Sequence, residues 1–219
     1  MIKTNIDNIN KKIKNACERA GRQPSEITLV AVTKTASIIQ VKEAVDCGLQ
    51  DFGENRIQMA QEKIAILGSI EGLRWHMIGH LQTNKVAKAV ELFDLIHGVD
   101  SIRLAEEINK KAKAKGVVFP VLLEVNVSGE ESKFGVRTEE VKSLIAQTDM
   151  LENIDVKGLM TMAPFSDDPE DSRPYFKKMA LLKTDLGLQY LSMGMTQDFE
   201  VAIEEGSNIV RIGRGIFDG

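Results

Sequence analysis

A lysine at the end of an apolar segment is the first residue in the sequence that suggests chemistry. Lys34 follows the run ITLVAVT at 27–33, and a buried ammonium costs free energy unless a partner or a reaction uses it. Two interpretations stay open. Either the side chain extends past the apolar segment into water, or the amine loses water there and attacks a carbonyl to form a Schiff base. A Schiff base needs a carbonyl compound, so the sequence should also contain groups that anchor one.

Two glycine-containing segments near the C-terminus are typical of phosphate-binding turns. LSMGMT places Ser192 and Gly194 before an expected helix, and VRIGRGIF places Gly213 after an expected strand. Glycines let backbone N–H groups approach an anion closely, although each segment alone also fits an ordinary turn. Arg211 in the second segment is either a salt-bridge partner or a permanently charged donor that faces a ligand.

Other polar residues say less about the chemistry of the protein. His76 is expected as a buried core histidine, and the role of His80 stays undetermined; with His97 they do not form a metal-ligand spacing. Asn55 either touches a ligand or caps the following helix. The segment SGEESKFGV at 128–136 is either a surface turn or part of the rim of a site.

The elements that position these residues are strands and helices in alternation. The predicted strands cover 27–33, 50–55, 74–79, 94–99, 119–127, 155–162, 189–193 and 208–213. The predicted helices between them cover 37–47, 56–67, 82–91, 101–115, 138–148, 169–186 and 196–205. Strict alternation predicts parallel strands joined by right-handed crossovers.

Eight such units predict an α/β fold, a (β/α)8 TIM barrel. Ile2, Ile6, Ile9 and Ile13 form a helical stripe that adds an N-terminal helix, with Gly21 placed to cap it. An open doubly wound sheet is the alternative, but no glycine-rich turn follows the first strand. Because the C-terminal ends of barrel strands meet at one mouth, we expect the residues after each strand to form the site.

The composition disfavours several classes of protein. The chain has 219 residues and a net charge of −4 at pH 7, which disfavours a nucleic-acid or anionic-membrane binder. No segment approaches the roughly 20 apolar residues of a membrane span, and the polar N-terminus does not resemble a signal peptide. Cys17 and Cys47 have no zinc spacing and are expected as reduced thiols. We therefore expect one cytoplasmic domain, residues 1–219, that is monomeric and needs no metal.

The sequence as a whole resembles a known family. The segments VAVTKT, FGENRIQ, WHMIGHLQTNK, VNVSGEESKFGV, GLMTM, LSMGMT and VRIGRGIF closely resemble those of the pyridoxal phosphate homeostasis proteins, single-domain relatives of the alanine racemase barrel. The resemblance implies that pyridoxal 5′-phosphate is the cofactor. It assigns these residues to the cofactor site: Lys34, Asn55, Ser192, Met193, Gly194, Arg211, Gly213 and Arg214.

The same resemblance implies a role for each of these residues. Lys34 would carry the cofactor as an aldimine, and Arg211 would face the pyridine nitrogen. Ser192, Gly194 and the backbone around Gly213 and Arg214 would hold the phosphate. Asn55 and Met193 would line the pocket.

The implied function is control of the supply of free cofactor, with apo-forms of cofactor-dependent enzymes as candidate recipients, rather than catalytic turnover. In the racemases a tyrosine acts opposite the lysine; here Tyr175 lies in a loop–helix region and Tyr190 at the start of a strand, away from the site. An amino-acid racemase or another small cofactor-dependent enzyme remains the alternative. A Schiff-base aldolase that needs no cofactor is the third.

Overall fold

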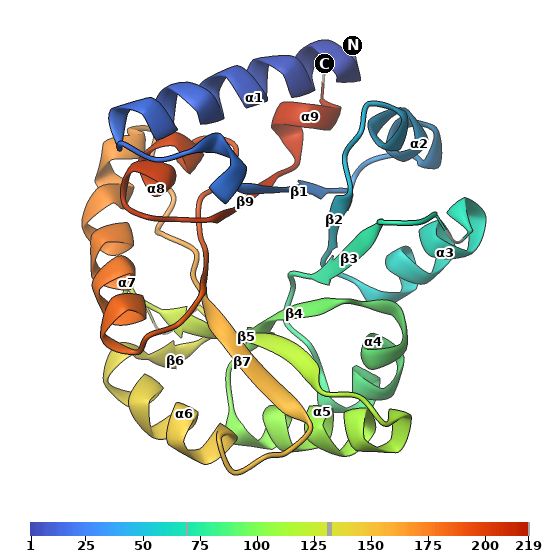
Figure 1. The fold of residues 1–219 in the computed structure, drawn as a ribbon, viewed down its shortest axis with the longest axis vertical. Coiled ribbons are helices and arrows are strands. Elements are labelled where there is room, and N and C mark those ends of the chain that lie inside the picture. Colours follow the sequence, from blue (N-terminus) through green and yellow to red (C-terminus); the bar gives the residue numbers. More distant parts are fainter. Residues whose placement is uncertain (69, 131–132, 219) are drawn as a thin grey trace.

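The computed structural model describes residues 1–68, 70–130 and 133–218. Within them, parallel strands form a closed barrel in the order β4-β3-β2-β1-β9-β8-β7-β5, and pairing of β5 with β4 completes the circle. Helices surround this barrel (Figure 1). The predicted (β/α)8 TIM barrel with an additional N-terminal helix is therefore confirmed.

Every barrel strand overlaps one of the predicted apolar runs. The strands are β1 (Thr28–Val32), β2 (Asp51–Glu54), β3 (Arg74–Met77), β4 (Leu95–Val99), β5 (Phe119–Asn126), β7 (Ile154–Met160), β8 (Tyr190–Ser192) and β9 (Ile209–Ile212). The short strand β6 (Val136–Arg137), which the sequence did not predict, pairs with the end of β5.

The helices also follow the predicted order. They are α1 (Ile2–Arg19), α2 (Ile38–Asp46), α3 (Ile57–Leu67), α4 (Val86–Leu92), α5 (Ile102–Lys115), α6 (Val141–Thr148), α7 (Arg173–Asp185), α8 (Phe199–Glu204) and α9 (Arg214–Phe217). Short 3₁₀ helices η1 (Pro24–Glu26), η2 (Thr83–Lys85), η3 (Thr138–Glu140) and η4 (Pro169–Ser172) precede β1, α4, α6 and α7. The sequence did not predict α9.

Side chains alternate between the two faces of the barrel wall. One cluster contains five buried apolar residues: Val30, Leu95, Leu122, Met160 and Ile209. A larger apolar cluster contains residues of the strands and of the surrounding helices. In β1, Val30 belongs to the first cluster and Ala31 to the second. Because strand side chains alternate, Lys34 falls on the same face as Val30.

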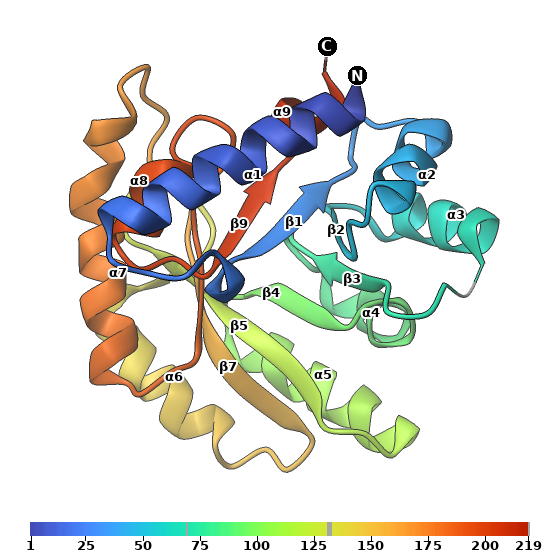
Figure 2. The same cartoon turned by 45° about the horizontal axis from the view of Figure 1, so that its top comes forward.

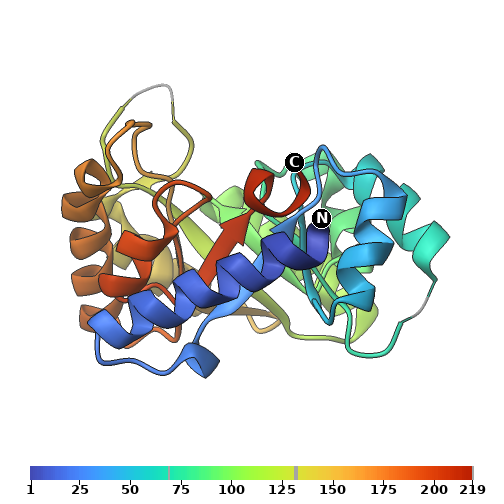
Figure 3. The same cartoon turned by 90° about the horizontal axis from the view of Figure 1, so that it is seen from above.

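Helix α1 covers the side of the barrel formed by the last elements of the chain (Figures 2 and 3). Its buried stripe, Ile2, Ile6, Ile9, Ile13, Ala16 and Cys17, packs against α8, α9 and α2. The helix ends at Arg19 with Ala20 as its C-cap, and Gly21 follows in the capping turn with a φ of +66°, which favours glycine. The Arg22 N–H donates to the Cys17 carbonyl at 2.9 Å and the Gly21 N–H to Glu18 at 3.3 Å, which is the Schellman pattern.

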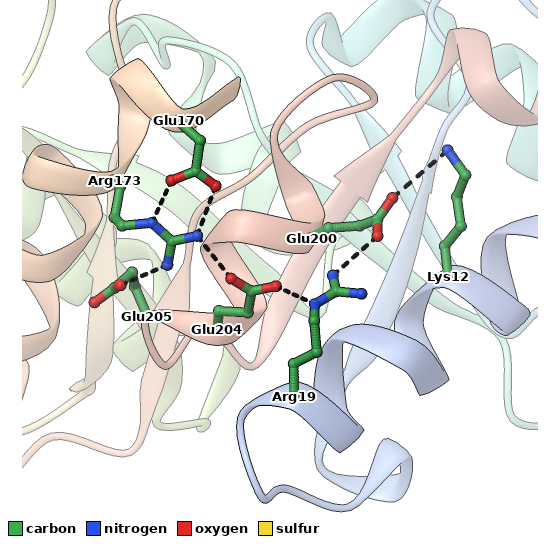
Figure 4. Close-up of polar contacts among 7 residues, drawn as sticks. All are labelled: Lys12, Arg19, Glu170, Arg173, Glu200, Glu204 and Glu205. Carbon is green, nitrogen blue, oxygen red and sulfur yellow. Dashed lines mark hydrogen bonds and ion pairs between the residues drawn. The ribbon is translucent and has the colours of Figure 1, made fainter. Parts of the chain in front are cut away.

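An ion-pair network ties α1 to α8 and α7 (Figure 4). Arg19 Nε lies 2.6 Å from Glu204 Oε1, and Lys12 Nζ lies 3.6 Å from Glu200 Oε1. Arg173 at the start of α7 reaches the same Glu204 carboxylate at 2.7 Å. The network therefore fixes the N-terminal helix to the helices on either side of β8.

Candidate functional site

A cavity of about 620 Å³ opens at the C-terminal ends of the barrel strands. Five of the eight residues expected at the site line it: Lys34, Asn55, Arg211, Gly213 and Arg214. They follow or belong to β1, β2 and β9, which are neighbours in the barrel. The convergence of strand ends that the sequence predicted therefore brings most of these residues into one cavity wall.

Lys34 combines a place in the cavity wall with an exposed side chain. It forms no ion pair with any residue that the structure describes. On the opposite face of the wall, the neighbouring Thr33 hydroxyl donates to Glu54 Oε1 at 2.7 Å, which fixes the strand end that carries Lys34. The backbone at Lys34 is thus fixed, while the lysine side chain stays accessible from the cavity.

The structure places Ser192, Met193 and Gly194 outside the cavity wall. The Ser192 side chain is fully buried, and its Oγ accepts a hydrogen bond from Arg211 Nη1 at 2.6 Å. Met193 is fully buried in the core between strands and helices. Gly194 has a φ of +91°, and a Cβ there would lie 2.5 Å from Cβ of Ala202. The ligand contacts expected of Ser192, Met193 and Gly194 stay predictions.

Thr196 was not singled out from the sequence, yet it lines the cavity near Gly213 and Arg214. Its Oγ1 accepts a hydrogen bond from the Gly215 N–H at 3.4 Å, which joins the β8–α8 turn to the start of α9. A hydroxyl, a guanidinium and a glycine backbone in one part of a cavity suit an anion such as a phosphate. The signal was present in LSMGMT, where a threonine ends the glycine-containing turn.

Arg211 is a buried cation at the cavity wall. It is 4% exposed, and its Nη2 donates to the Thr161 carbonyl at 3.0 Å. Burial lowers the pKa of Arg211 to about 10, while Glu124 and Asp198 act in the opposite sense. The guanidinium therefore remains charged at neutral pH and can only donate hydrogen bonds toward the cavity.

Glu124 is a second cavity residue that the sequence analysis did not select. It lies in β5 and is 4% exposed. Burial, and then the charge of Asp100, raise the pKa of Glu124 to about 7, while Arg211 lowers it. The carboxyl therefore changes its charge near neutral pH. A glutamate within VLLEVNV, on the face of a strand that points away from the helices, was the available signal.

Loop residues form the rim of the cavity. The His80 ring stacks on Phe134 with centroids 4.1 Å apart, and both line the cavity. Phe134 belongs to the segment 128–136, which is thus part of the rim; residues 131 and 132 of that segment lie outside the described residues. The segment that begins at Ala163 also reaches the cavity, since Phe165 lines it.

The described residues contain neither a metal-ligand cluster nor a membrane-spanning helix. In residues 1–68, 70–130 and 133–218, no group of three or more histidine, cysteine, aspartate or glutamate residues could hold a metal ion. Across the same described ranges, no helix has both the length and the apolar composition needed to span a bilayer.

Comparisons with known proteins agree over nearly the whole chain. The family described as "Alanine racemase, N-terminal domain" matches residues 4–218. A protein of Aquifex aeolicus named "Pyridoxal phosphate homeostasis protein" is 45% identical over 218 residues, which cover 97% of this chain and 95% of the relative.

Solved structures are also similar over most of this chain. PipY of Synechococcus elongatus, in a structure with PLP bound, is 31% identical, with a TM-score of 0.82 over 94% of this chain and 99% of that chain. An alanine racemase of Clostridium difficile is 18% identical, with a TM-score of 0.76; the match covers 98% of this chain and 56% of that chain. The second likeness shows the fold alone.

Proposed function

Since the chain belongs to the family of the alanine racemase N-terminal domain, we propose that it binds pyridoxal 5′-phosphate on Lys34 as a Schiff base. Its role is intracellular homeostasis of this cofactor, without robust catalytic turnover. Support comes from the relatives named as pyridoxal phosphate homeostasis proteins and from the PLP-bound structure of PipY.

One observation carries the proposal: an accessible lysine and an anion-binding group line the same cavity. Lys34 supplies the amine, and Thr196, Gly213 and Arg214 supply the contacts for a phosphate. A volume of about 620 Å³ is within the range of small-molecule sites. Asn55 adds a side-chain amide to the wall beside Lys34.

Arg211 is the residue that we assign to the pyridine nitrogen. When bound, pyridoxal phosphate supplies an electron sink for reactions next to an amine. A guanidinium that stays charged donates a hydrogen bond to the ring nitrogen and does not give it a proton, so the ring remains a weaker sink. This arrangement suits a carrier better than a catalyst of carbanion chemistry.

The accessibility of Lys34 also favours a carrier. Its exposed side chain leaves room for water or an acceptor amine to reach the attachment point, which reversible release requires. Neither Tyr175 nor Tyr190 lines the cavity, so the described wall holds no tyrosine to act opposite Lys34.

A racemase or other small cofactor-dependent enzyme is the second candidate, and Glu124 is the observation that favours it. A carboxyl with a pKa of about 7 in the cavity wall has the properties of a general acid–base group. Formation of D-alanine from L-alanine by the loaded protein, abolished in both Lys34→Ala and Glu124→Gln, would support this candidate and overturn the carrier.

Borohydride reduction tests the attachment directly. Purified protein is incubated with pyridoxal phosphate, reduced, digested and mapped by mass spectrometry. We expect the pyridoxyl group on the peptide that contains Lys34 and no labelling of that site in Lys34→Ala. Lys88→Ala, on α4 and outside the cavity wall, is the matched control and should label normally. Labelling at another lysine in wild type, or borohydride trapping of a sugar phosphate by protein free of cofactor, would overturn the proposal.

Several finer statements belong to the same proposal. We propose that residues 1–219 form one domain, that the protein is a cytoplasmic monomer, and that apo-forms of cofactor-dependent enzymes receive the cofactor. The family match over residues 4–218 supports the first statement. Sedimentation of the loaded and cofactor-free protein tests the second, and transfer to a purified apo-enzyme tests the third.

A further inference from the structure

Four polar side chains form a continuous hydrogen-bonded array inside the barrel, beside the cavity. This interior polar array consists of Asp51, His76, His97 and Ser192, one each from β2, β3, β4 and β8, and all are 7% exposed or less. Asp51 Oδ1 lies 2.9 Å from His76 Nε2. His76 Nδ1 lies 3.0 Å from His97 Nε2, and His97 Nδ1 lies 3.0 Å from Ser192 Oγ. Arg211 Nη1 then donates to Ser192 Oγ at 2.6 Å.

The two ends of the array carry opposite charges. Arg211 has donors only, so Ser192 Oγ must accept from it. At the other end, Asp51 also accepts two hydrogen bonds from Arg74, at 2.7 and 2.6 Å. Burial raises the pKa of Asp51, but its hydrogen bonds with His76 and Arg74 outweigh burial and hold that pKa below the usual range. Asp51 is therefore a carboxylate that can only accept.

When both rings are neutral, the Asp51 end fixes every proton in the array. Asp51 can only accept, so His76 carries its hydrogen on Nε2 and accepts at Nδ1. His97 must then carry its hydrogen on Nε2 and donate to His76 Nδ1. Ser192 Oγ, which accepts from Arg211, in turn donates its hydrogen to His97 Nδ1. The reverse order would place an unprotonated His76 nitrogen against the Asp51 carboxylate.

Electrostatics favours the same arrangement. Burial is the largest cause that holds the pKa of His97 well below its ordinary value, and the Arg211 charge acts in the same sense, so this ring is neutral. Every hydrogen in the array points away from the Arg211 cation and toward the Asp51 anion. Such aligned hydrogen bonds polarise one another and stabilise both buried charges.

We propose that Asp51, His76, His97 and Ser192 are positioning residues, which orient the Arg211 guanidinium in the cavity wall through one fixed order of hydrogen bonds. The Thr161 carbonyl, which accepts from Arg211 Nη2 at 3.0 Å, is the second anchor. The array acts on the cofactor only through Arg211, so this inference rests on the proposed function where it concerns the cofactor. The proton order itself does not depend on any ligand.

The first test needs no cofactor. Long-range ¹H–¹⁵N NMR of the cofactor-free protein at mildly alkaline pH distinguishes the two neutral histidine tautomers from the cation. We expect both His76 and His97 to carry the hydrogen on Nε2, and His80→Gln assigns the third histidine by removing its signals. A hydrogen on Nδ1 of either ring, or a doubly protonated ring, would overturn the inference even if the protein binds pyridoxal phosphate.

The second test compares two replacements of His97. Glutamine can accept from Ser192 and donate to His76, whereas leucine can do neither. His97→Leu should shift the absorption band of the bound cofactor and raise its dissociation constant about tenfold, which corresponds to one lost hydrogen bond. His97→Gln should restore both values, a rescue that a purely space-filling role of His97 does not predict.

Asp155→Asn is the matched control. Asp155 is an aspartate at the start of β7 that pairs with Lys157 at 2.6 Å and lies outside the array. Its replacement should leave the band and the affinity unchanged. Wild-type values in a folded His97→Leu variant would overturn the positioning role. Absence of cofactor binding in the wild type would overturn the proposed function instead, and the tautomer measurement would still decide the array.

Discussion

The two faces of the barrel wall at the end of β1 each have a lysine and a buried glutamate, but the groups are arranged differently. On the outer face, the Lys63 ammonium donates to Glu54 Oε1 and to the Thr33 carbonyl, and both charged side chains are 6% exposed or less. On the inner face, Lys34 and Glu124 line the cavity, and neither forms an ion pair with another described residue.

The difference separates a structural pair from groups that are free to react. A buried ammonium is tolerated on the outer face because a carboxylate and a carbonyl compensate it. The inner lysine lacks such compensation but has access to water, so its amine remains available to a carbonyl ligand. Lys34 and Thr33 are adjacent in sequence, and the alternation of the strand assigns them to opposite faces.

Removal of the outer lysine should have the largest effect on stability. Lys63→Met leaves the fully buried Glu54 carboxylate without its cation, so the free energy of unfolding should fall by about 3–5 kcal/mol. Urea denaturation measures it, and borohydride labelling of Lys34 should persist wherever the protein is folded. The double variant Lys63→Met/Glu54→Gln should recover part of the loss. A loss below about 1 kcal/mol would remove the contrast between the two faces.

Replacement of the inner glutamate, Glu124, should have the next largest effect on the free energy of unfolding, and this replacement should stabilise the protein. Burial first, and then Asp100, raise the pKa of Glu124 from 4.5 to about 7. The unfolded chain ionises at lower pH, so the stability contributed by the protonated carboxyl is complete below about pH 4.5 and is lost as the pH rises through 7. Glu124→Gln should therefore match wild type at about pH 4 and be more stable by up to about 3 kcal/mol at about pH 8.

Thermal or urea unfolding across this pH range checks that prediction. Asp155→Asn, at an exposed ion pair on β7, provides a control for removing a carboxylate elsewhere in the barrel. Equal stability of Glu124→Gln and wild type at alkaline pH would show that the inner carboxyl is compensated like the outer one.

The exposed network in Figure 4 should give a smaller effect. Arg173 contacts Glu170, Glu204 and Glu205 at 2.6–2.8 Å, and its side chain is 31% exposed. Because water screens these pairs, Arg173→Ala should cost about 1 kcal/mol or less, with the loss shrinking at high salt. Urea unfolding at low and high salt measures both values; a loss equal to that of Lys63→Met would contradict the role given to burial.

The smallest effect on stability should come from the lysine with the largest effect on the ligand. Lys34→Ala removes an exposed side chain that has no ion pair among the described residues, so the unfolding free energy should change by about 0.5 kcal/mol or less. The same variant should lose covalent binding of pyridoxal phosphate completely. A matched pair of measurements, cofactor-free unfolding and absorbance after loading, separates the two effects.

Much of the fold could be predicted from local sequence patterns. Short apolar runs alternate with amphipathic stretches, and each run overlaps a barrel strand. Strand β6 and helix α9 were missed because they contain two and four residues, too few to show a period. The position of Lys34 just after the first strand could be predicted because the apolar run before it ends at Thr33.

Site residues could be predicted only where position along a strand decides which face of the barrel wall a side chain occupies. Alternation placed Arg211 on the inner face, but nothing local shows that Ser192 lies below the cavity and contacts His97, 95 residues away. Met193 follows Ser192, so its side chain points the other way, into the strand–helix core. Glu124 was overlooked because the raised pKa of its carboxyl depends first on burial and then on Asp100, and both arise only in the folded barrel.

The place of α1 has a consequence for how the protein is made. Helix α1 is the first element of the chain, yet it packs on α8 and α9, the last two. The Asn5 side-chain amide donates to the Ile216 carbonyl at 3.0 Å across a sequence separation of 211 residues. During synthesis the apolar stripe of α1 therefore lacks its final partners until α8 and α9 have left the ribosome. Closing this long loop is expected to be a late and slow event, with a temporarily exposed isoleucine stripe as a target for chaperones.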